Sequence, residues 1–226
     1  DPSIKGIFSI IGGEESIRLL PYIDYDIIHN NPKIFLGHSD ATITHFMCLK
    51  AGIRSFYGTD VMTGFAENVE MHKNTVDGLR RALFSKEIIG DIPQDQEGWT
   101  SEHLSWKVPE NQNIRRPLNK QIPWRFLGAN QNVQGRLIGG CVEVLPFMIG
   151  TELWPNLETW KNTILFLETS EEGAPPIVLE RMLRNLAAQK ILRNVKGILF
   201  SKPGGDKVKP ETFIDYDRAI LKVLSE

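Results

Sequence analysis

The most constraining feature of this sequence is a short apolar run that leads directly into a serine and then into a helical pattern. Ile34-Phe35-Leu36 is followed by Gly37-His38-Ser39-Asp40, and residues 41–51 carry apolar side chains at helical spacing. A strand that turns sharply into a helix exposes the serine hydroxyl at the carboxyl end of a sheet, and the helix start offers free N–H groups to a developing oxyanion. Ser39 is therefore a candidate nucleophile in a nucleophile elbow.

A plainer interpretation stays open, because Ser and Asp are also the commonest residues at helix N-caps. The full Gly-x-Ser-x-Gly pattern is absent, so on spacing alone the capping interpretation is favoured. In either case Asp40 is a good cap for a helix whose inner face is Ile43, Phe46 and Met47. The pair Gly12-Gly13 follows another predicted strand, and predicts either a backbone loop that approaches a ligand or an ordinary turn.

Strand and helix patterns alternate along the chain, which indicates an α/β fold with parallel strands. Predicted strands are 5–11, 33–36, 137–145, 163–168 and 195–200, and predicted helices are 15–20, 41–51 and 176–189, with a last helix beginning near Pro210. Between them, Trp, Pro, Gln and Asn accumulate over about 50 residues, which is long for a plain connection. We therefore expect three parts: a nucleophile domain at 1–85, a Trp-rich linker or flap at 86–134, and a C-terminal α/β domain at 135–226.

Composition excludes several classes of function. The net charge of −2, with scattered Lys and Arg, argues against a nucleic-acid partner. The apolar runs are far shorter than the roughly 20 residues of a membrane span, so no membrane partner is expected. Cys48 and Cys141 are too few for a disulfide scaffold, which favours a cytoplasmic setting. Because no His, Cys or carboxylate cluster has ligand spacing, we expect no metal and no organic cofactor.

Several motifs together resemble one family. They are Lys5-Gly6-Ile7-Phe8-Ser9-Ile10-Ile11-Gly12-Gly13, Leu19-Leu20-Pro21-Tyr22, Gly37-His38-Ser39-Asp40-Ala41-Thr42, Phe56-Tyr57-Gly58, Gly135-Arg136-Leu137-Ile138-Gly139-Gly140 and Ile164-Leu165-Phe166-Leu167-Glu168. In this order and spacing they resemble the LD-carboxypeptidases and microcin C immunity proteins, over nearly the whole chain. The resemblance implies a parallel α/β N-terminal domain, here partial, and a smaller C-terminal α/β domain, with the site between them.

The resemblance also implies a Ser-Glu-His serine peptidase. Ser39 would be the nucleophile, Glu168 the acid that orients the histidine, and the backbone of Asp40 and of Gly12-Gly13 the oxyanion hole. Glu171 and Glu172, which follow, are expected on a solvated turn. A homodimer is implied by resemblance alone.

Two positions depart from the family pattern. Cys141 stands where Asn is common, which puts any side-chain contact from there in doubt. His38 stands where Tyr is typical, but neighbouring residues at such a turn point apart, so we do not expect His38 to be the base.

The catalytic histidine itself is missing. The chain has five histidines, and all of them precede Glu168, whereas the family order is Ser, Glu, His. We therefore interpret the sequence as a piece of the family fold that lacks both ends, and predict that this chain alone is nearly inactive. Loss of a triad member typically costs on the order of 10⁴–10⁶ in rate.

Two substrate classes compete within the family. Trp99, Trp106 and Trp124 favour the immunity branch, in which an aromatic ring stacks on the base of a peptidyl- or aminoacyl-nucleotide. The alternative, a murein tetrapeptide carboxypeptidase, would need a cation for the terminal carboxylate. Its candidates are Arg54, Arg115, Arg116 and Arg125. A non-catalytic α/β binding module is the third possibility, and the bland interpretation of the three tryptophans is that they anchor a surface excursion.

Overall fold

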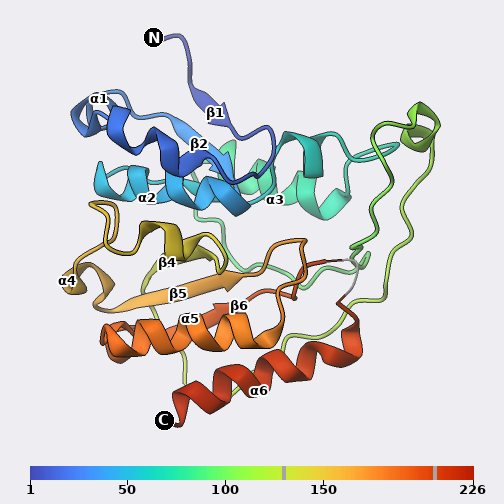
Figure 1. Ribbon diagram of the computed structural model, residues 1–226. Helices are drawn as coiled ribbons and strands as arrows, with labels where there is room; N and C mark the ends of the chain where they lie inside the picture. The colour runs from blue at the N-terminus through green and yellow to red at the C-terminus, as the bar shows by residue number, and fades with distance from the viewer. Residues whose placement is uncertain (129–130, 206–207) are drawn as a thin grey trace.

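The computed structural model describes residues 1–128, 131–205 and 208–226, in which the strands form two parallel three-stranded sheets (Figure 1). Strands β1 (Gly6–Phe8), β2 (Ile34–Gly37) and β3 (Phe56–Tyr57) form the first sheet, in that spatial order. Strands β4 (Arg136–Cys141), β5 (Thr163–Glu168) and β6 (Gly197–Phe200) form the second. The predicted α/β class with parallel sheets is confirmed.

The helices connect and cover these strands. In the first half they are η1 (Ser16–Tyr22), α1 (Tyr25–Asn30), η2 (Ser39–Ala41), α2 (Thr42–Lys50), η3 (Val61–Phe65) and α3 (Lys73–Leu83). In the second half they are η4 (Pro109–Asn113), η5 (Leu145–Met148), α4 (Leu157–Trp160), α5 (Pro176–Ala188), η6 (Ile191–Arg193), η7 (Pro210–Thr212) and α6 (Phe213–Leu224). Across the described ranges, no helix is both long enough and apolar enough to span a membrane.

Helix α2 lies between the two sheets and joins them into one body (Figure 1). Its Ile43, Phe46 and Met47 are buried in a core shared with β4, β5, α5 and α6. On its other side, Cys48 packs with Phe35 of β2. A helix that is buried on two sides fixes the carboxyl end of β2 relative to the second sheet, and so sets where the elbow faces.

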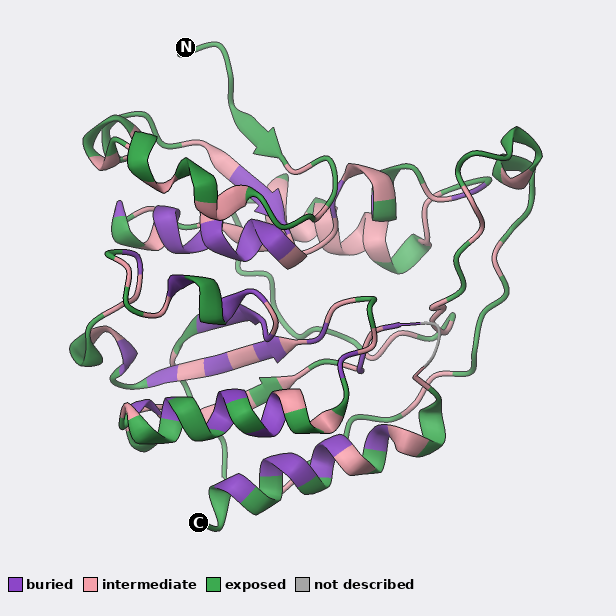
Figure 2. Ribbon diagram, in the orientation of Figure 1, coloured by how far each residue is buried: buried purple, intermediate pink, exposed green. Residues whose placement is uncertain are grey.

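The second sheet is covered by α5 and α6, each of which alternates buried and exposed positions (Figure 2). Leu179, Leu183 and Leu186 of α5 are completely buried, at the i, i+4, i+7 spacing of one helix face. Burying one leucine side chain of this kind contributes about 2 kcal/mol. Together with the fully buried Trp160 of α4, these residues place most of the buried core in the C-terminal half of the chain.

Residues 86–128 form a long, largely exposed excursion along one side of the molecule (Figures 1 and 2). An isolated antiparallel bridge joins Trp99 to Asn119. The excursion is fastened to α6 by Arg125, which donates two hydrogen bonds to Asp217, at 2.7 and 2.9 Å.

Several predicted elements differ from the observed ones. The predicted strands 163–168 and 33–36 match β5 and, within a residue, β2. The predicted strand 5–11 is only three residues long, because residues 9–11 leave the sheet, and the predicted strand 137–145 ends at Cys141 in a turn. The predicted helix 15–20 is a 3₁₀ helix containing Pro21. Sequence patterns missed α1, β3, α3 and α4.

Candidate active site

Ser39 occupies a strained turn between β2 and α2. Its φ angle is +57°, in the left-handed region that residues other than glycine rarely adopt and that costs of order 1 kcal/mol. A Cβ at Gly37 would lie 2.8 Å from Cβ of Ser9 and 2.9 Å from Cβ of Ala41, so only glycine fits two residues before the serine. The predicted strand-turn-helix geometry around Ser39 is present, with Ala41 in place of the second glycine.

Asp40 does not cap the helix that follows it. Its Oδ2 instead accepts hydrogen bonds from the backbone N–H of Glu15 (3.1 Å) and Ser16 (2.9 Å) and from Oγ of Ser16 (2.7 Å). Neither η2 nor α2 has a side-chain cap in the structure. The predicted capping role of Asp40 is therefore wrong, because its carboxylate turns toward the loop that precedes η1.

This link holds the glycine pair against the nucleophile. A Cβ at Gly12 would lie 2.9 Å from both Cβ and Oγ of Ser39, and one at Gly13 would lie 3.7 Å from Oδ2 of Asp40. The backbone at Gly12 thus touches the serine side chain with no room for a methyl group. The structure brings together Gly12, Gly13, Ser39 and Asp40, the residues predicted for nucleophile and oxyanion hole.

Glu168 ends strand β5 and reaches the elbow through Tyr57. The Tyr57 hydroxyl donates to Oε1 of Glu168 at 2.6 Å, and the backbone N–H of Ser39 donates to the Tyr57 oxygen at 3.1 Å. Burial raises the pKa of Glu168, while the hydrogen bond from Tyr57 opposes that rise. Sequence reasoning missed Tyr57, although its place in the Phe56-Tyr57-Gly58 motif was a signal.

Cys141 lies beside this carboxylate at the end of β4. Its backbone N–H donates to Oγ1 of Thr42 at 3.0 Å, which joins the second sheet to the start of α2. Burial, and then the negative charges of Glu168 and Glu143, raise the pKa of the Cys141 thiol, so it stays protonated. Glu171 and Glu172 lie on an exposed turn beyond Glu168, as predicted.

The histidines are engaged elsewhere. Nδ1 of His38 lies 3.5 Å from Oδ2 of the buried Asp60. His45 is buried, with Nε2 3.0 Å from the carbonyl of Gly37 and Nδ1 2.8 Å from Oγ of Ser55, and burial lowers its pKa to about 4. In the part of the chain that the structure describes, we find no hydrogen bond from any histidine to Ser39 or Glu168.

Comparison with known proteins decides the family. The model described as the LD-carboxypeptidase N-terminal domain matches residues 1–58, and the one described as the LD-carboxypeptidase C-terminal domain matches residues 134–226. A MccF-like protein from Streptococcus pneumoniae, solved in complex with AMP, superposes with a TM-score of 0.86 at 30% identity, covering 98% of this chain and 68% of that one. The chain belongs to the LD-carboxypeptidase family.

Other relatives within the family carry the immunity name. The microcin C7 self-immunity protein MccF of Escherichia coli is 32% identical over 203 residues, which are 89% of this chain and 57% of the relative. A structure of MccF in complex with aspartyl sulfamoyl adenosine has a TM-score of 0.80 at 29% identity, covering 100% of this chain and 65% of that one. This member of the LD-carboxypeptidase family thus spans little more than half the length of its E. coli relative.

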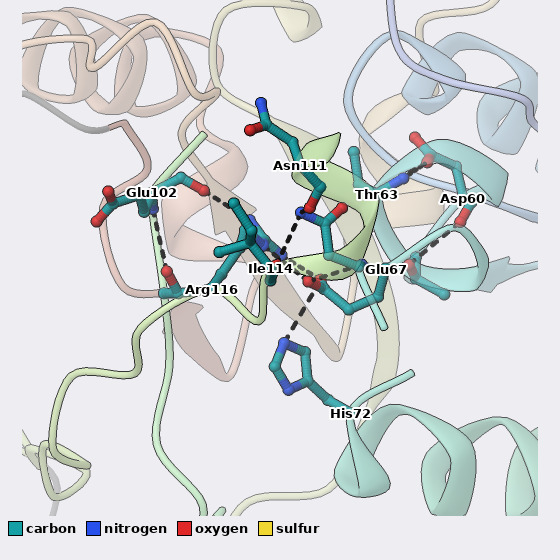
Figure 3. A network of polar contacts seen from close by, with 11 residues as sticks. Asp60, Thr63, Glu67, His72, Glu102, Asn111, Ile114 and Arg116 are labelled. Atoms are coloured by element: carbon teal, nitrogen blue, oxygen red, sulfur yellow. Dashed lines mark hydrogen bonds and ion pairs between the residues drawn. The ribbon is translucent and has the colours of Figure 1, made fainter. Parts of the chain in front are cut away.

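Residues 59–133 lie between the two matched ranges, and a polar network holds part of them in place (Figure 3). Arg116 donates to both carboxylate oxygens of Glu67, at 2.8 Å for the contact from Nε, and to the carbonyl of Glu102 at 2.8 Å. Nδ2 of Asn68 donates to the carbonyls of Asn111 (2.9 Å) and Ile114 (3.2 Å). We call residues 102–116 the arm, and the contacts of Glu67 and Asn68 with it the clasp.

The three predicted tryptophans lie in different settings. Trp99 packs on α6, with its ring 5.9 Å from that of Phe213, and its Nε1 donates to the carbonyl of Lys120 at 3.1 Å, so it anchors the excursion. Trp106 on the arm is 40% exposed, and Trp124 is 56% exposed. Of the three, the structure accounts for Trp99 by packing and leaves the Trp106 and Trp124 rings accessible.

Three of the four candidate cations are already paired. Arg116 binds Glu67, Arg125 binds Asp217, and Arg115 forms an exposed ion pair with Glu70 at 2.6 Å. Arg54 is exposed on the loop before β3. The arrangement of Arg115, Arg116 and Arg125 is that of structural ion pairs.

Proposed function

We propose that this protein is a serine peptidase that cleaves the amide bond of peptidyl- or aminoacyl-nucleotides, in the manner of a microcin C immunity protein. The observation that carries the proposal is the geometry at Ser39, a strained serine at a strand-to-helix turn whose backbone is linked through one tyrosine to Glu168. The homology to MccF supports the substrate class.

In the proposed mechanism Oγ of Ser39 attacks the carbonyl carbon while its proton passes to a histidine base. Glu168 holds that histidine in the correct tautomer and stabilises it when charged. Its burial favours a strong, directional hydrogen bond to the ring, provided that the carboxyl stays ionised. None of the five histidines of this sequence supplies the base in the arrangement described above. We therefore expect the 226-residue chain to turn over slowly by itself.

The oxyanion would be bound by backbone N–H groups. The N–H of Ser39 is already used by Tyr57, so the donors we propose are those of Asp40 and of the Gly12-Gly13 loop. The carboxylate of Asp40 contributes indirectly, because it fixes the loop that begins at Gly12 through Glu15 and Ser16.

Two observations favour a nucleotide-bearing substrate over a murein peptide. Relatives with this fold were solved with AMP and with aspartyl sulfamoyl adenosine, and the rings of Trp106 and Trp124 are open to stack on a base, a contact of about 1–3 kcal/mol. A murein carboxypeptidase would need a cation for the terminal carboxylate, and three of the four candidates, Arg115, Arg116 and Arg125, are already paired with carboxylates, which leaves the exposed Arg54.

The test compares two ligands on the purified protein. Calorimetry should detect binding of aspartyl sulfamoyl adenosine, whereas a murein tetrapeptide should bind at least about tenfold more weakly, as expected for one lost stacking contact. With the hydrolysable aspartyl-adenylate amide, Ser39→Ala should retain binding and lose whatever cleavage the unsubstituted protein shows. Preferential binding of the tetrapeptide would reverse the substrate assignment, and equal cleavage by Ser39→Ala would remove Ser39 from the mechanism.

A further inference from the structure

Tyr57 ends strand β3 and contacts both halves of the proposed site. Its phenolic oxygen is 3.1 Å from the backbone nitrogen of Ser39, 3.2 Å from Oγ1 of Thr42 and 2.6 Å from Oε1 of Glu168. The first two partners belong to the elbow, and Glu168 lies at the end of β5 in the second sheet. One atom therefore connects the candidate nucleophile to the candidate acid.

We propose that Tyr57 is a positioning residue that fixes Ser39 relative to Glu168 and donates a hydrogen bond that favours the charged form of the Glu168 carboxyl. The roles of Ser39 and Glu168 as nucleophile and acid rest on the proposed function. The link between them rests on the hydrogen bonds alone.

The direction of each hydrogen bond follows from the protons available. The backbone nitrogen of Ser39 can only donate, so the Tyr57 oxygen accepts there. The single phenolic proton is directed to Glu168, which as a carboxylate can only accept. Thr42 must then donate to Tyr57, and its own oxygen accepts from the N–H of Cys141. This chain of donors runs one way, from the elbow and Cys141 toward Glu168.

Tyr57 stays protonated. Burial, and then the negative charge of Glu168, raise the pKa of Tyr57 far above that of an ordinary tyrosine. The phenol therefore donates at every pH at which the protein would work. Its ring is held between the ring of His45, at 5.0 Å, and that of Phe166, at 5.0 Å, so the hydroxyl cannot swing away without disturbing both halves.

Loss of this hydroxyl should make Glu168 harder to ionise. Burial raises the pKa of Glu168, and so does the negative charge of Glu143. The hydrogen bond from Tyr57 lowers this pKa, as do the charge of a protonated His38 and a contact with Cys141. Without the hydrogen bond from Tyr57, burial should raise the pKa of Glu168 further. A protonated Glu168 could not stabilise a histidinium, so in the variant the carboxyl would lose its proposed role at a higher pH than in the unsubstituted protein.

The experiment uses Tyr57→Phe, which keeps the ring and removes one oxygen, with Tyr25→Phe as the matched control. Tyr25 also donates its hydroxyl to a glutamate, Glu152 at 3.0 Å, but on the surface away from Ser39. The first readout is the titration of Glu168, followed by NMR of the carboxyl carbons in glutamate-labelled protein. The second is the backbone amide resonance of Ser39, whose acceptor is the Tyr57 oxygen.

In Tyr57→Phe we expect the Glu168 midpoint to rise by at least about one pH unit, the usual effect of losing a hydrogen bond to a charged group. The amide resonance of Ser39 should also shift, because its phenolic acceptor is removed. Tyr25→Phe should change neither. An unchanged Glu168 midpoint in Tyr57→Phe, or an equal shift in Tyr25→Phe, overturns the proposal.

A second variant tests the same link from the other end and covers the case in which Tyr57→Phe does not fold. Glu168→Gln keeps the side-chain shape and removes the charge that Tyr57 donates to. The amide resonance of Ser39 should then shift, because its acceptor is the same phenolic oxygen, and an unmoved resonance refutes the bridge. These outcomes are distinct from failure of the proposed function, which would show as cleavage by Ser39→Ala.

Discussion

The clasp on the arm offers the sharpest test of how the excursion is held. The carboxylate of Glu67 is almost completely buried, with 4% of its side chain exposed, and Arg116 is the cation that neutralises it, itself 23% exposed. Although burial alone would raise the pKa of Glu67, the hydrogen bonds and charge of Arg116 hold it below the usual value. Replacing Arg116 therefore removes the main partner of a buried carboxylate and leaves it with the longer contact to Nε2 of His72, at 3.4 Å.

The expected loss of stability in Arg116→Gln follows from the burial of this ion pair. Removing one partner of a buried ion pair costs about 3–5 kcal/mol, and the partial exposure of Arg116 places Arg116→Gln at the lower end, about 3 kcal/mol. If the arm opens locally, that loss increases the open population about 150-fold. The neighbouring pair of Arg115 and Glu70 is exposed, so Arg115→Gln should cost less than about 0.5 kcal/mol.

Limited trypsin digestion measures this opening, because the exposed Lys107 lies within the arm. Cleavage after Lys107, followed by mass spectrometry, should be about 100-fold faster in Arg116→Gln than in Arg115→Gln when opening is fast relative to cleavage. Rates for the two variants within about threefold of each other would refute the reasoning. They would mean that backbone contacts, such as those from Asn68, hold the arm without the ion pair.

The pH dependence of the clasp has a definite sign. Because the folded-state pKa of Glu67 is depressed, its contribution to stability is present above the unfolded value of about 4.3 and is lost as pH falls through the folded pKa. Protection of the arm against hydrogen exchange, corrected for the intrinsic rate, should therefore decrease in acid below that range. Glu67→Gln should lack this dependence.

Three further predictions concern the body of the protein. Gly12→Ala should lower the free energy of unfolding by about 1–3 kcal/mol, since the added methyl would touch the Ser39 hydroxyl, while Gly78→Ala, in open space on α3, should be neutral or stabilise by about 0.5–1 kcal/mol. The pKa of His45 is about 4 in the folded protein and about 6.5 in the unfolded chain, so acid favours the unfolded chain, which binds the proton more readily. Urea denaturation should therefore show that the free energy of unfolding falls by about 3 kcal/mol between pH 7 and pH 4. The fall should be smaller in His45→Gln. In the same assay, Trp160→Ala should lower the free energy of unfolding by about 3–5 kcal/mol, because Trp160 is fully buried. Trp124→Ala, at an exposed position, should lower it by less than about 0.5 kcal/mol. Unchanged stability in Gly12→Ala, a flat pH profile of unfolding, or equal costs for the two tryptophans would each contradict the corresponding contact.

The elements that the sequence predicted best are those in which the local pattern and the tertiary structure agree. Strand β5 and helix α5 have nearly the predicted bounds, because each buries a regular apolar pattern in the same core. Strand β3 was missed because two residues carry no detectable periodicity. Its existence depends on pairing with β2, which is a long-range interaction.

In the candidate site, too, local features were predicted from the sequence and long-range contacts were not. The sequence by itself determined the turn at Ser39, because the requirements for a small residue at Gly37 and a helix start are local. It misassigned Asp40, whose hydrogen-bond partners lie 24 and 25 residues earlier in the chain. It also could not distinguish paired from free arginines, since Arg125 and Asp217 are 92 residues apart.

What only the tertiary structure decided is how the two sheets face each other. Residues 111 positions apart meet at the Tyr57–Glu168 hydrogen bond because α2 is buried between the sheets and fixes their carboxyl ends opposite one another. Propensity and periodicity act over a few residues, whereas that arrangement depends on packing across the whole core. The sequence therefore predicted the serine, and the folded chain connected it to the glutamate.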